Sequence, residues 1–138
     1  ISSQQLIEKY PNNLLFNLQR AELLTLTGQY EQAEIYLDKL EKSKKSIFTS
    51  SILTLRGLRE EFGNKRYNVA ENYYQKALLH AWEERFTKDI YGLALLGSAR
   101  LEFRKGNKSK AIEFAKKAAD FVEYKNSIAE QKRLLKLQ

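Results

Sequence analysis

Apolar residues recur every three or four positions along three stretches of the chain, and each stretch ends at a glycine. The runs cover residues 14–26, 52–58 and 90–103. This spacing places apolar side chains on one face of a helix, so each run predicts an amphipathic helix. Glycine adopts the left-handed conformation that closes many helices, so each run is expected to end there. The three turn glycines are Gly28, Gly63 and Gly106.

After each glycine a second helix is expected, because the same spacing resumes from Tyr30, Tyr67 and Ala111. The second of these helices is predicted to be long, from Val69 to about Glu84, with Asn68 and Glu71 at the spacing of a capping box.

The resulting unit of helix, turn and helix recurs along the chain. Units are expected at about 12–43, 47–84 and 87–124. A terminal helix is predicted over 128–138, preceded by a capping box from Ser127 to Glu130. The segment Ser2–Tyr10, which Pro11 ends, is interpreted as the last turns of a preceding unit, so the chain is expected to be a fragment of a longer protein.

Composition supports one all-α domain over residues 1–138. The chain has one proline and six glycines among 138 residues, and strong helix formers dominate the rest. No stretch alternates apolar and polar positions as a half-buried strand would. No apolar run approaches 18 residues, so no transmembrane segment is expected. The compartment stays open between cytoplasm and periplasm.

Several kinds of chemistry are excluded by residue type. Cysteine is absent and His80 is the only histidine, which rules out thiolate nucleophiles, cysteine zinc sites and sites that need two imidazoles. The adjacent carboxylates Glu60–Glu61 and Glu83–Glu84 point about 100° apart on a helix and read as solvated surface. We therefore expect no catalytic, cofactor or metal site, and no small-molecule substrate.

These features together resemble the tetratricopeptide repeat family. The first unit carries a small residue in its first helix, a turn glycine, an aromatic two residues later, and then alanine and a large apolar residue. These residues are Ala21, Gly28, Tyr30, Ala33 and Leu37. The second unit keeps Gly63, Tyr67, Ala70, Tyr74 and Ala77, and the third keeps Ala99, Gly106, Ala111, Ala115 and Ala118. The second turn is two residues longer than the first, which leaves the register of residues 49–62 ambiguous.

The resemblance implies a right-handed superhelix of antiparallel helix pairs, a solenoid stabilised by stacking through the small residues and aromatic wedges. It also implies that the first helices line a concave groove that binds a peptide or helix of another protein. The corresponding groove residues are Leu18, Glu22, Arg56, Arg59, Leu96, Arg100 and Phe103. Apolar residues mixed with arginines predict a partner segment with acidic flanks.

Two alternatives stay open. Long repeats of this kind resemble those of bacterial regulatory proteins, so the chain could be a sensor module of a larger transcriptional or signalling protein. The net charge is +7, and residues 100–138 contribute +6 of it. Such a basic segment could bind nucleic acid, although the pattern favours a protein partner.

Overall fold

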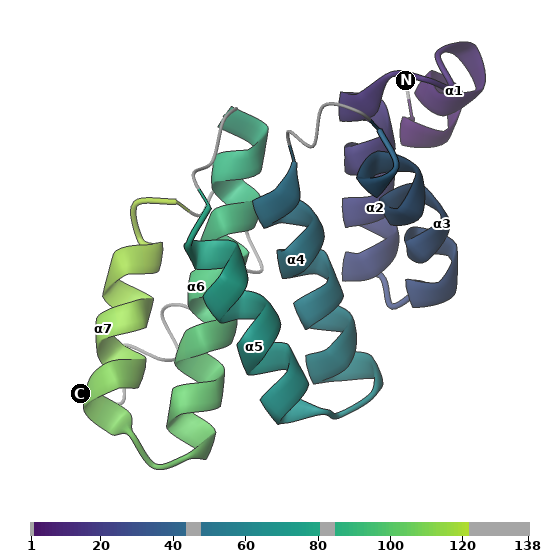
Figure 1. Cartoon of the computed structure of the whole chain (residues 1–138). Helices are drawn as coiled ribbons and strands as arrows, with labels where there is room; N and C mark the ends of the chain where they lie inside the picture. Colours follow the sequence, from purple (N-terminus) through teal and green to yellow (C-terminus); the bar gives the residue numbers. More distant parts are fainter. Residues whose placement is uncertain (1, 44–47, 81–84, 122–138) are drawn as a thin grey trace.

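The computed structural model describes residues 2–43, 48–80 and 85–121, and in these residues the fold is all-α, with no strand. A short helix α1 (Ser3–Lys9) precedes three helix pairs. The pairs are α2 (Leu14–Leu26) with α3 (Tyr30–Glu41), α4 (Thr49–Leu58) with α5 (Tyr67–Leu78), and α6 (Arg85–Arg104) with α7 (Lys108–Ala118). The helices of each pair run antiparallel, and the three turns lie along one edge of the molecule, the lower edge in Figure 1. The predicted all-α class is therefore confirmed.

The first two helices begin at side-chain caps. The Ser2 hydroxyl accepts a hydrogen bond from the Gln5 backbone, and the Gln5 side chain accepts one from the Ser2 backbone, so α1 opens with its own capping box. The Asn13 carboxamide accepts a hydrogen bond from the Phe16 N–H at the start of α2. The predicted capping box at Asn68 and Glu71 is wrong, because α5 begins at Tyr67 and its N-cap, Arg66, makes no side-chain cap bond.

The turn of the second pair differs from the other two. A π-helical turn, η1 (Arg59–Gly63), follows α4, and the Asn64 N–H donates to the Arg59 carbonyl at 3.0 Å. Positive φ angles occur at Gly28 (+80°) and Gly106 (+85°), as predicted, but in the second turn the positive φ falls on Lys65 (+57°) instead of Gly63. The π turn moves the left-handed position two residues along the chain.

The extra length of the third unit lies in its first helix. The predicted long helix from Val69 to Glu84 is wrong, since α5 ends at Leu78. Instead α6 is 20 residues long and begins at Arg85, ahead of the apolar run from residue 90 that predicted this helix. Residues 81–84 and the predicted helix 128–138 lie outside the described residues, as does the capping box at Ser127.

Tyrosine rings close the junctions between neighbouring pairs. The Tyr30 ring lies against Gly63, where an added Cβ would come within 2.9 Å of it. Tyr74 of α5 is fully buried between Gly57 of α4 and Gly97 of α6. The expected aromatic wedges are therefore present, and they need glycine on the opposite helix. The buried alanines of the repeat, such as Ala33, let the helices approach closely.

Candidate functional site

A cleft of about 360 Å³ opens between the turn of the second pair and the end of α6. Three of its residues come from η1 and its turn, one from the start of α5 and three from the last turns of α6. The lining residues are Glu61, Phe62, Lys65, Tyr67, Arg100, Phe103 and Arg104. With three cations and one carboxylate, its walls carry a net charge of +2. We call it the basic cleft.

The floor of the basic cleft is a buried ion pair tied to the core. Arg100 donates to Glu61 from Nε to Oε2 at 2.7 Å and from Nη2 to Oε1 at 2.9 Å. The Tyr74 hydroxyl also donates to Glu61 Oε1, at 2.7 Å. Burial, reinforced by the negative charge of Glu61, raises the pKa of Tyr74 well above its ordinary value, so the phenol stays protonated. Both oxygens of Glu61 are thus occupied by groups of the chain itself.

The rim of the basic cleft carries two cations that have no carboxylate partner in the part of the chain that the structure describes. Among the described residues, neither Lys65 nor Arg104 lies within 4.0 Å of an Asp or Glu oxygen. The Arg104 guanidinium instead lies 3.7 Å from the centroid of the Tyr67 ring, which is a close cation–π stack. Stacking covers a face of the guanidinium and leaves its N–H edge available for an acceptor.

Two phenylalanines complete the rim. Phe62 and Phe103 expose 47% and 41% of their surface, whereas most large apolar side chains in the described residues are buried or partly buried. The Arg100 guanidinium lies 4.8 Å from the centroid of the Phe62 ring. Half-exposed aromatic rings beside cations without carboxylate partners are typical of surfaces that contact another molecule.

A second cleft, of about 450 Å³, lies between the first pair and the second. It has a similar construction, since Tyr30 begins α3 as Tyr67 begins α5, and the end of the next first helix forms the opposite wall. Its charged residues are one anion and one cation, Glu31 and Arg59. We call it the neutral cleft.

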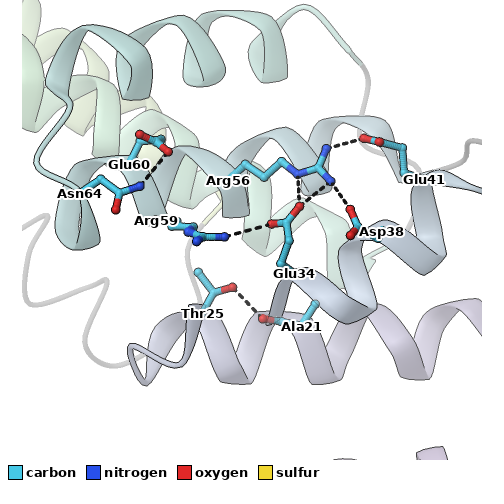
Figure 2. A network of polar contacts seen from close by, with 9 residues as sticks. All are labelled: Ala21, Thr25, Glu34, Asp38, Glu41, Arg56, Arg59, Glu60 and Asn64. Atoms are coloured by element: carbon cyan, nitrogen blue, oxygen red, sulfur yellow. Dashed lines mark hydrogen bonds and ion pairs between the residues drawn. The ribbon is translucent and has the colours of Figure 1, made fainter. Parts of the chain in front are cut away.

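The predicted arginines of the second unit are engaged within the chain. Arg56 of α4 donates to Glu34 at 2.8 Å and to Asp38 at 3.1 Å, and it also pairs with Glu41 (Figure 2). Burial lowers the pKa of Arg56, but the hydrogen bonds that it donates to Glu41 and Glu34 outweigh that effect and raise the pKa. Arg59 lies 3.7 Å from the other oxygen of Glu34. This cluster joins α3 to α4.

The predicted groove residues do not form one open surface. Leu18 and Leu96 are fully buried, and Glu22 is 6% exposed. The side chains of Arg56 and Arg100 are both 16% exposed and both ion-paired, so the expectation of exposed arginines is corrected. Their carboxylate partners lie too far along the chain for sequence spacing to reveal the pairing. Phe103 is accessible and lies in the basic cleft, beside Arg100.

Lys65 and Phe62 were not predicted as site residues. The interpretation of Glu61 as solvated surface is wrong, because its side chain is 5% exposed and bonded to Tyr74 and Arg100. One signal was present, namely the longer second turn, because extra residues at one turn of a repeat indicate a local specialisation. Arg104 was recognised as part of the basic segment and Tyr67 as a packing residue, but their stacking was not foreseen.

The described residues hold no group of three or more His, Asp or Glu side chains suited to a metal ion. His80 is exposed. Within the part of the chain that is described, no helix combines the length and the apolar character needed to cross a membrane. No protein-family model matches the chain, and no match was found among curated proteins or solved structures.

Proposed function

We propose that this chain is an interaction module that binds a short segment of a partner protein, and that the basic cleft is the contact surface. The observation that carries the proposal is the rim of the cleft. There Lys65 and Arg104 have no carboxylate partner among residues 2–43, 48–80 and 85–121, and Phe62 and Phe103 are half exposed. A segment that supplies acidic and apolar side chains would satisfy both features at once.

The proposal includes a tetratricopeptide-like superhelix as the scaffold. Three consecutive helix pairs, buried alanines at the close approaches and glycine or lysine at each turn support it. In such a stack each pair covers an apolar face of its neighbour, and the junctions recur along one edge. A binding role is also favoured over catalysis, because the buried carboxylate of the cleft is saturated by Tyr74 and Arg100.

A selection from a library of random short peptides, displayed on phage and panned on the 138-residue chain, tests the proposal. We expect enriched peptides that bind the wild-type chain with micromolar affinity and lose binding to the Phe103→Asp variant. Phe103 is partly exposed at the end of α6, so this change should leave the fold intact, which circular dichroism would verify. An exposed control, Ile35→Asp on α3, should keep full binding.

Failure to enrich any peptide, or equal binding to the Phe103→Asp variant, would refute the assignment of the cleft. A short single-stranded oligonucleotide should be included as a competitor. If it displaces the peptides and its affinity falls by orders of magnitude between about 50 and 200 mM salt, the basic surface is a nucleic-acid site and the peptide proposal is wrong.

A further inference from the structure

Lys65 has a positive φ angle at a turn position that glycine occupies in the other two turns. At each of the three turns, one N–H closes the helix end by bonding to a carbonyl far back in the helix. The donors are Gln29, Arg66 and Asn107, whose N–H groups lie 2.8–2.9 Å from the carbonyls of Leu24, Glu60 and Glu102. The residue before each donor has a positive φ. These residues are Gly28, Lys65 and Gly106.

Glycine is the usual residue at this position, because a side chain with a Cβ is strained in the left-handed region. The second turn contains a glycine and an asparagine, Gly63 and Asn64, directly before Lys65, and either would tolerate a positive φ better. The chain instead places the strained conformation on a lysine, and that lysine lines the basic cleft. Strain at one residue in a binding surface points to a role for its side chain.

The charges around the cleft indicate which kind of chemical group Lys65 binds. Arg100 is already held by both oxygens of Glu61, so its charge is compensated. The available positive charge is therefore that of Lys65, in the turn after η1, and of Arg104, at the end of α6. Phe62 and Phe103 line the same cleft and are partly exposed, so they offer an apolar contact. The equivalent neutral cleft lacks this charge, although it is of similar volume.

We propose that the basic cleft recognises a peptide in which a bulky apolar side chain is flanked by carboxylates. Lys65 and Arg104 bind the carboxylates, Phe62 and Phe103 contact the apolar side chain, and the strained backbone of Lys65 places its ammonium group at the rim. The sequence pattern predicts Arg100 as a groove residue that contacts the partner. In the structure it is instead a positioning residue, because its ion pair with Glu61 holds the floor of the cleft in place. This inference rests on the proposed function and adds the chemistry of the ligand.

Fluorescence anisotropy with three labelled peptides tests the ligand chemistry. The first peptide has a Leu-Phe pair flanked by glutamates, the second has glutamines in place of the glutamates, and the third has alanines in place of Leu-Phe. We expect the first to bind and each of the others to bind at least about fivefold more weakly, the scale of one exposed ion pair or one partly buried side chain. Equal binding of the first two peptides would overturn the recognition of carboxylates.

Substitution of Lys65 separates a binding role from a structural one. In Lys65→Gly, relief of the left-handed strain should raise the thermal midpoint by about 3–5 °C, while the affinity for the first peptide falls about fivefold. Arg104→Gln should lower the affinity to a similar extent. Lys65→Arg, which keeps the charge, should keep the affinity. Lys116→Gln removes one exposed charge of α7 outside the cleft and should change neither quantity.

The outcomes distinguish the two proposals. If peptides selected from the library bind the cleft but Lys65→Gly binds the first peptide as well as the wild type, the ligand chemistry is wrong and the interaction module stands. If the wild-type chain binds none of the peptides from either experiment, both proposals fail.

Discussion

Substitution of Gly97 by alanine should destabilise the chain although alanine is the better helix former. A Cβ at residue 97 would lie 2.4 Å from Cε2 and 2.5 Å from Cζ of Tyr74. Ordinary contacts begin near 3.4 Å, so the ring would have to move by about 1 Å. It has no room on the far side, where it touches Gly57 of α4. The junction must therefore open, or the ring must turn away from Glu61.

The size of the effect follows from three contributions. Overpacking of a core costs about 1–3 kcal/mol. A strained or broken hydrogen bond from Tyr74 to the buried charge of Glu61 costs about 1.5–3 kcal/mol. The gain in helix propensity from glycine to alanine returns about 1 kcal/mol. The net loss should be about 2–4 kcal/mol in the free energy of unfolding.

Urea denaturation followed by far-UV circular dichroism would measure this loss, and a double-mutant cycle would assign it to the ring. In a Tyr74→Leu background the ring is absent, so Gly97→Ala should cost at least about 1 kcal/mol less than in the wild type. If Gly97→Ala is neutral or stabilising in the wild-type chain, or if the two changes are additive, the wedge role of Tyr74 is refuted.

Three further predictions concern single residues. Arg100→Ala leaves Glu61 buried without a counter-charge, so it should cost about 3 kcal/mol or more in urea denaturation. Asn13→Ala removes the cap of α2 and should cost about 1 kcal/mol in the same assay. A hydrogen bond from Asn107, aided by Lys105, lowers the pKa of Glu102 below its ordinary 4.5. The stabilisation from Glu102 should therefore be complete above that value and be lost as the pH falls through the lower folded-state pKa.

Each of these predictions has a result that contradicts it. Loss of less than about 1 kcal/mol in Arg100→Ala would show that the ion pair is not buried in solution. Unchanged stability of Asn13→Ala would mean that water replaces the cap. For Glu102→Gln, the difference in stability from wild type should be present at neutral pH and vanish in acid. A difference that is independent of pH would exclude the carboxylate as its source.

The three helix pairs and two of the three turns could be predicted from the sequence because local rules determine them, whereas the end of α5 and the start of α6 were predicted wrongly. The run over residues 14–26 became α2 with the same bounds, and Gly28 and Gly106 adopt the expected left-handed conformation. Periodicity and turn chemistry depend on near neighbours, so a single sequence reports them well.

The prediction for the second turn was wrong because the π-helical geometry of this turn depends on tertiary contacts. Glu61 is directed to Tyr74 and Arg100, which lie 13 and 39 residues away along the chain. Nothing in the local pattern of residues 59–65 indicates these distant contacts, so the pattern predicts a helix end at Gly63. The same reason explains why Arg56 and Arg100 were expected to be exposed, since their carboxylate partners come from other helices.

The two junctions of the stack differ in how they respond to dissolved ions. α3 and α4 are joined by the Arg56 cluster, whose partners Asp38 and Glu41 have side chains more than half exposed. Mobile ions screen such pairs, whereas they hardly reach the enclosed phenol and carboxylate that join α5 to η1 and α6. High ionic strength should therefore loosen the amino-terminal third selectively, and the chain would then bend at one joint while the other stays rigid.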